Sequence, residues 1–166
     1  MRKALLGLSA AVVLLLAFWL YPILFPSDEE RIRRVLNDMA KAAEVHANEA
    51  PLARLGKANK LAGFFASDIE INLQGVPADW ANILGRDQLR EVILAGRAHL
   101  RQWRLELLGV SIRVDRNEPM AEAFTTAVAE INGEKNAVVQ ELRLTLKKTE
   151  RRWLISRVDT ISTLRR

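Results

Sequence analysis

The chain contains 166 residues, with 25 Lys or Arg, 20 Asp or Glu, two His and no Cys. This length suits one ordinary domain. The lack of Cys excludes disulfide scaffolds, Cys-based zinc sites, iron–sulfur clusters and thiol catalysis, and two His leave little for a metal centre. The sequence also lacks a phosphate-binding glycine loop, a G-x-S-x-G elbow and an H-E-x-x-H motif. We therefore expect neither a metal nor a cofactor.

The N-terminal part of the chain is an uncharged, mostly apolar run over residues 4–25. As a helix, these 22 residues would extend roughly 33 Å, which is enough to cross a bilayer. A cleaved signal peptide would have a shorter apolar run and a small-x-small site, whereas this run ends in the bulky Trp19, Tyr21 and Phe25. The sequence predicts an uncleaved transmembrane anchor at residues 1–26 and one domain at residues 27–166.

The orientation of such an anchor depends on the excess of basic residues on its cytoplasmic side. Arg2 and Lys3 precede the apolar run, and the acidic residues 28–30 follow it directly. Three Arg between positions 31 and 34 lie within the same range. We expect the N-terminus inside and the domain outside the cytoplasm, while the opposite orientation stays open.

Two helices are predicted at the start of the domain. Apolar residues spaced three and four apart indicate an amphipathic helix over residues 28–44. Ser27 and Glu30 stand at the spacing of a capping box. After a polar break, the same periodicity predicts a second helix over residues 52–65 that ends near Ser67.

The middle of the domain changes period. Apolar and polar residues alternate over residues 69–73, which predicts a half-buried strand. Residues 75–85 are rich in Gly, Pro, Asp and Asn and are typical of a loop. A third helix is expected over residues 87–100.

In the last third of the chain, alternation in period two predicts strands at residues 103–114, 138–148 and 153–161. Turn residues at 115–118 and at Asn132-Gly133 indicate a further strand between them, at residues 120–131. The alternation changes phase at Leu108-Gly109, where we expect a bulge. In the last strand, Arg157 and Asp159 are expected to share the phase of Trp153 and Ile155. We expect the four strands to form an antiparallel meander.

The order of these elements, together with three short phrases, resembles the NTF2-like superfamily, in particular its SnoaL-like and ketosteroid-isomerase-like branch. The phrases are LAGFFASD (61–68), GRDQLR (85–90) and RWLIS (152–156). The resemblance covers about residues 28–161. It implies an α+β cone in which a bent, mainly antiparallel sheet wraps around three helices, with a pocket between sheet and helices. It also implies frequent homodimers through the outer face of the sheet.

The resemblance bears on catalysis as well. Isomerase-like members have a catalytic acid just after the first strand, which here falls around Asn72, Leu73 and Gln74, where no carboxylate stands. The family's polar pocket residue on the first helix would fall near His46. This makes His46 the one candidate base from the resemblance, against the alternative of an exposed His at a frayed helix end.

Polar and aromatic residues of the expected pocket are ligand-binding candidates. If the phase of Arg157 and Asp159 faces the cavity, the two form a charge pair that could bind an anionic or polar ligand, with Asp159 also a candidate base. The alternative is a plain structural salt bridge. The other candidates are Asn72, Trp80, Trp103 and Gln140.

Two functions follow from these patterns. We expect a non-catalytic module that binds a small ligand or assembles an envelope complex, with the bilayer, a second copy of the chain and envelope proteins as partners. The alternative is a SnoaL-like enzyme that transfers a proton (isomerase, cyclase or dehydratase type) on a small apolar substrate, and the missing acid near Asn72 argues against it. Nucleic acid is not expected as a partner, because the basic clusters lack interleaved aromatic residues.

Overall fold

The computed structural model describes residues 26–76, 78–132, 137–150 and 152–161. The helices are α2 (Asp28–Ala43), α3 (Pro51–Ala62), α4 (Ala78–Ala81) and α5 (Arg86–His99). The strands are β1 (Phe65–Asn72), β2 (Asn82–Leu84), β3 (Trp103–Val114), β4 (Met120–Ile131), β5 (Val138–Thr149) and β6 (Arg152–Thr160).

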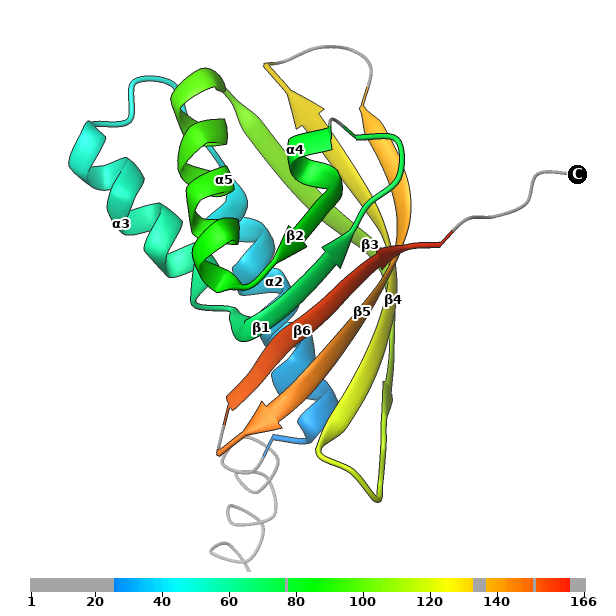
Figure 1. Ribbon diagram of the computed structural model, residues 1–166. Coiled ribbons are helices and arrows are strands. Elements are labelled where there is room, and N and C mark those ends of the chain that lie inside the picture. Colours follow the sequence, from blue (N-terminus) through cyan, green and yellow to red (C-terminus); the bar gives the residue numbers. More distant parts are fainter. Residues whose placement is uncertain (1–25, 77, 133–136, 151, 162–166) are drawn as a thin grey trace, which may run out of the picture.

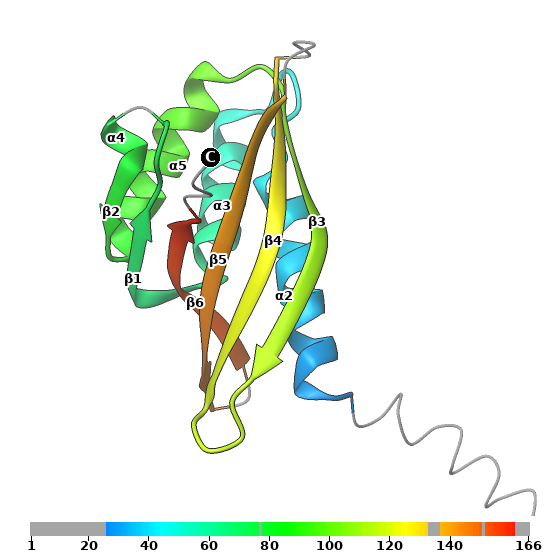
Figure 2. The same cartoon turned by 90° about the vertical axis from the view of Figure 1, so that its right-hand side faces the viewer.

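The strands of this part of the chain form one sheet in the order β2-β1-β6-β5-β4-β3. Strands β3 to β6 pair antiparallel in sequence, which confirms the predicted meander. Strand β1 is parallel to β6 and antiparallel to β2, so the sheet is mixed. Figure 1 shows the long, curved β3–β5 on one side and α2, α3 and α5 on the other, and Figure 2 shows the curvature from a second direction. The α+β cone predicted from the sequence is confirmed.

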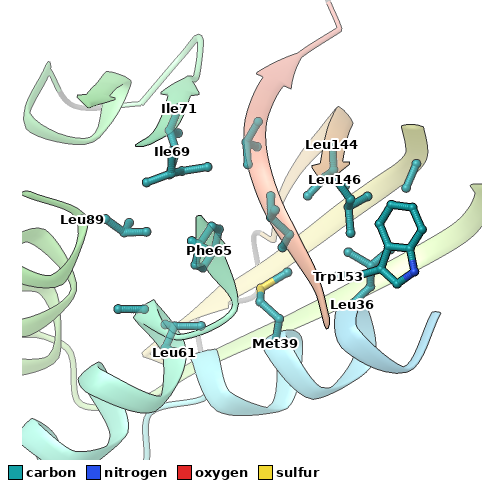
Figure 3. Close-up of a cluster of buried hydrophobic side chains, with 14 of the residues drawn as sticks. Leu36, Met39, Leu61, Phe65, Ile69, Ile71, Leu89, Leu144, Leu146 and Trp153 are labelled. Atoms are coloured by element: carbon teal, nitrogen blue, oxygen red, sulfur yellow. The ribbon is translucent and has the colours of Figure 1, made fainter. Parts of the chain in front are cut away.

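The core lies between the inner face of the sheet and the helices. Leu36 and Met39 from α2, Leu61 from α3 and Leu89 from α5 are all buried against strand residues. Figure 3 shows these side chains pointing toward the strand residues Phe65, Ile69, Ile71, Leu144, Leu146 and Trp153. Full burial of each Leu or Ile side chain contributes about 1.5–3 kcal/mol, so the periodic apolar face of each helix is what attaches it to the sheet.

The N-terminus of α2 has the predicted capping box. The Ser27 hydroxyl accepts a hydrogen bond from the Glu30 N–H at 3.2 Å, and the Glu30 carboxylate accepts one from the Ser27 N–H at 3.1 Å. Two backbone donors of the first turn are therefore satisfied without water.

Two boundaries differ from the prediction. Helix α3 ends at Ala62, and β1 begins at Phe65, where residues up to 65 were expected to be helical. Tertiary pairing is the reason, because the Phe64 carbonyl accepts a hydrogen bond from the Ile155 N–H of β6. The predicted loop at 75–85 contains α4 and β2, and β2 forms because three residues pair with the edge of β1. Neither pairing has a local signal.

Two irregularities change the phase of strands. The predicted bulge of β3 is confirmed by a register shift between Leu108 and Ser111, with Gly109 at φ 62°. A second shift, between Thr145 and Leu146 against β6, was not predicted. Past it, Val158 is buried and Arg157 and Asp159 face outward, so the expected common phase with Trp153 and Ile155 is wrong.

No helix among the residues described above is long and apolar enough to cross a membrane. The anchor predicted for residues 1–26 falls on positions 1–25, which lie outside those residues, and it stays a prediction.

Candidate functional site

The inner face of the long strands is apolar. The inward positions of β3, β4 and β5 from Trp103 to Leu146 carry aliphatic, aromatic, threonine or glutamine side chains and no titratable group. Thr125, a buried polar residue of this face, donates its hydroxyl to the Leu108 carbonyl at 2.9 Å. This surface can contact an apolar molecule, but it offers no acid or base.

Three of the predicted ligand-binding residues come together on the outer face instead. Arg157 donates from Nε to Asp159 Oδ2 at 2.9 Å and from Nη1 to Glu70 Oε2 at 2.9 Å. Asn72 donates from Nδ2 to Asp159 Oδ1 at 3.2 Å. Arg143 lies 3.8 Å from Asp159. The charge pair predicted for Arg157 and Asp159 is therefore present, on the face opposite to the helices.

The electrostatics of this cluster make Asp159 a weak base. Burial of the carboxylate raises its pKa, but the hydrogen bonds from Arg157 and Asn72 and the charges of Arg157 and Arg143 together lower the pKa below its usual value. A general base for neutral pH needs the opposite shift. These side chains form an ion-pair and hydrogen-bond network across β5, β6 and β1.

The other predicted site residues are dispersed. The Gln140 side chain donates to the Gln74 carbonyl at 2.6 Å. Trp103 pairs through its backbone with Val45, and Trp80 packs on Gly96 of α5. His46 is exposed, and its backbone N–H donates to Glu49 at 3.2 Å. These residues do not converge on one cavity with Arg157 and Asp159.

A buried charged network connects α5 to the α2–α3 connection, and it was not predicted from the sequence. Arg97 donates from Nη1 to Glu49 Oε2 at 3.1 Å and from Nη2 to the Ala42 carbonyl at 2.5 Å. Lys57 of α3 contacts the same carboxylate at 2.6 Å. Burial raises the pKa of Glu49, yet these cations and the hydrogen bond from the His46 N–H lower it below its usual value. The one available signal was position: Arg97 follows Leu89 and Ile93 at intervals of four on the buried face of α5.

A surface groove lies between α2, the end of α3 and the start of β6. Its volume is about 390 Å³, and its lining is Arg31, Val35, Asn59, Lys60, Gly63, Phe64, Arg152, Trp153 and Leu154. These residues are far apart in the chain, so no local sequence motif could predict the groove. In the described ranges, no three His, Asp or Glu side chains gather as metal ligands would.

No family model and no curated protein matches the sequence. Solved structures do have the same architecture. An NTF2-like protein with a cystatin-like fold from Novosphingobium aromaticivorans is 20% identical, with a TM-score of 0.62 over 94% of this chain and 88% of that one. The fold is NTF2-like.

Other proteins of this fold have names that suggest chemistry. A candidate scytalone dehydratase from the same organism is 16% identical, with a TM-score of 0.59 over 82% of this chain and 85% of its own. A candidate aromatic ring hydroxylase, also from Novosphingobium aromaticivorans, is 14% identical, with a TM-score of 0.64 over 83% of this chain and 90% of its own. At these identities the likeness concerns the NTF2-like fold, which supports many unrelated activities.

Proposed function

We propose that this chain is a non-catalytic NTF2-like module that binds a small ligand. The observation that carries the proposal is the location of the two candidate bases. His46 is exposed in the connection between α2 and α3, and Asp159 is paired with Arg157 on the outer face of the sheet. The inward positions of β3, β4 and β5 from Trp103 to Leu146 have no titratable side chain to replace them.

The membrane tether belongs to the same proposal. The uncharged run of residues 4–25 is long enough to cross a bilayer and ends directly before the capped start of α2. A module attached in this way could present a ligand to envelope proteins or take one from them. The acidic residues 28–30 favour a domain outside the cytoplasm.

The second candidate is a SnoaL-like enzyme acting by proton transfer on a small apolar substrate. The name of the scytalone dehydratase candidate favours it, because a dehydration is carried out by proton transfer. It requires a positioned base next to the substrate, and the lowered pKa of Asp159 makes that residue a poor choice. We therefore place it second.

One experiment separates the two functions. The full chain, in nanodiscs of zwitterionic phosphatidylcholine, is incubated with a panel of aromatic acids, phenols, cyclic ketones and their neutral analogues, and NMR follows ligand binding and product formation in the same sample. We expect binding without turnover, unchanged in His46→Ala and Asp159→Asn. Turnover that either substitution abolishes would establish the enzyme instead. Binding of no compound would overturn the proposed module.

A further inference from the structure

The groove between α2, α3 and β6 is lined by cationic and apolar side chains. Its volume of about 390 Å³ is within the size range of small-molecule sites. It is separate from the inner face of β3–β5, because its lining comes from α2, from the residues around the end of α3 and from the first residues of β6.

Polar contacts hold the Trp153 indole in the apolar part of the groove. Trp153 is 3% exposed, and its indole Nε1 donates to Asp28 Oδ1 at 3.1 Å. The Lys148 ammonium lies 5.6 Å from the ring centroid and also contacts Asp28 at 2.9 Å. The indole is thus fixed from behind, and with Val35, Phe64 and Leu154 it offers an apolar and aromatic wall.

The charged part of the groove is cationic only. Its lining contains Arg31, Lys60 and Arg152 and no Asp or Glu. Among the described residues, Lys60 and Arg152 have no ion pair, and the Arg152 guanidinium donates a hydrogen bond to the Gly63 carbonyl at 3.4 Å. Arg31 stands 3.8 Å from Asp28, too far for a hydrogen bond. By contrast, the nearby Lys147 and Lys148 are neutralised by Asp68 and Asp28.

We propose that this groove binds an anionic amphiphile, a molecule whose negative headgroup is joined to a small apolar or aromatic part. The headgroup lies between Lys60, Arg152 and Arg31, and the apolar part lies against Trp153 and Phe64. Charge-assisted hydrogen bonds to guanidinium and ammonium groups favour a carboxylate or phosphate. The inference rests on the proposed function only in taking the chain to be a binding module, and it names the site and the ligand class.

The test uses the indole N–H of Trp153 as a reporter inside the groove. The full chain carrying ¹⁵N-tryptophan is placed in phosphatidylcholine nanodiscs, and its Trp153 resonance is assigned from Trp153→Phe. If that variant does not fold, assignment by elimination from Phe variants of Trp19, Trp80 and Trp103 replaces it. The probes are 4-phenylbutyrate, its neutral amide and acetate, and a parallel sample replaces part of the phosphatidylcholine with phosphatidylglycerol.

We expect 4-phenylbutyrate to shift the Trp153 resonance saturably and the amide and acetate to bind at least tenfold more weakly. Lys60→Gln combined with Arg152→Gln should weaken binding of the acid at least tenfold. Arg101→Gln removes an exposed charge outside the groove and should leave binding unchanged. A shift caused by phosphatidylglycerol, and lost in the double variant, also supports the site and identifies a membrane lipid as the source of the headgroup.

The inference is overturned if the amide binds as tightly as the acid, if neither the acid nor phosphatidylglycerol shifts the Trp153 resonance, or if Arg101→Gln weakens binding as much as the double variant. A ligand that binds without shifting this resonance would also overturn the assignment of the groove as the binding site. That last result would leave the proposed binding module standing, because the ligand would then occupy another part of the fold.

Discussion

Arg97 of α5 and Glu49 of the α2–α3 connection form an ion pair of 3.1 Å whose side chains are 2% and 5% exposed. The pair is completed by Lys57 on the carboxylate and by the Ala42 carbonyl on the guanidinium. In the described chain, Arg97 Nε has no hydrogen-bond partner, so only these contacts compensate the buried guanidinium for its lost hydration. Desolvated charges of this kind are costly when one partner is removed.

Glu49→Ala should therefore destabilise the protein strongly. Removal of the carboxylate leaves the buried Arg97 charge uncompensated, which costs about 3–5 kcal/mol of unfolding free energy. Urea denaturation measures the loss. The matched control is Glu91→Ala, which removes an exposed carboxylate from α5 and should change stability by less than about 0.5 kcal/mol. Equal effects of the two substitutions would contradict a structural role for the pair.

The same carboxylate predicts a pH dependence. The folded protein lowers the pKa of Glu49. The ionised carboxylate therefore makes its full contribution to the free energy of unfolding above the unfolded pKa of about 4.3, and this contribution is lost as pH falls through the lower folded pKa. Asp28, Asp68 and Asp159 have lowered pKa values too, so the wild-type curve alone does not isolate Glu49. The difference in unfolding free energy between wild type and Glu49→Gln should shrink below about pH 4.3. A difference that stays constant down to pH 2.5 would be inconsistent with this shift.

Gly96→Ala tests the packing of α4 on α5. A Cβ at Gly96 would lie 2.5 Å from Cη2 of Trp80, so the indole must move. We expect a net loss of about 1–2 kcal/mol, since overpacking outweighs the gain in helix propensity. Gly56→Ala on α3, where nothing lies within 4 Å of the added carbon, should instead stabilise by up to about 1 kcal/mol. Thermal unfolding measures the stability of both variants. If Gly96→Ala is destabilised and the added substitution Trp80→Leu does not restore its stability, the steric explanation is refuted.

Asp159→Ala should have a small effect on stability. The side chain is 15% exposed, but its partners Arg157 and Arg143 are each 48% exposed and regain water when the carboxylate is removed. We expect a loss of about 0–1 kcal/mol, the range of surface ion pairs. Chemical denaturation measures it, and ligand binding by the full chain should be unaffected. If the variant has unchanged stability but binds ligand more weakly, Asp159 is part of the ligand-binding site.

Removal of residues 1–26 should release a soluble, folded domain. Among the described residues, the core between α2, α3, α5 and the sheet begins with Ile32, while the removed run is the most apolar part of the chain. Circular dichroism and gel filtration of residues 27–166 check this outcome. Aggregation or an unfolded spectrum would show that the N-terminal segment contributes to the fold.

The helices and long strands followed from local pattern. The period of Ile32, Leu36 and Met39 predicted α2 and its buried face, and the alternation on either side of the bulge predicted β3 with both of its boundaries. The capping box at Ser27 and the bulge at Gly109 were also visible, because side-chain chemistry and backbone freedom at single residues produce them.

Features that depend on pairing between distant segments were decided by the tertiary structure. The register shift between β5 and β6 turned Arg157 and Asp159 to the outer face, and a one-residue slip reverses every later side chain without any change in composition. Likewise, Arg97 and Glu49 are 48 residues apart, and the lining of the groove extends from Arg31 to Leu154. Local sequence determines which face of an element is apolar, whereas a charged network or a groove exists only once several elements pack, because its energy comes from contacts between them.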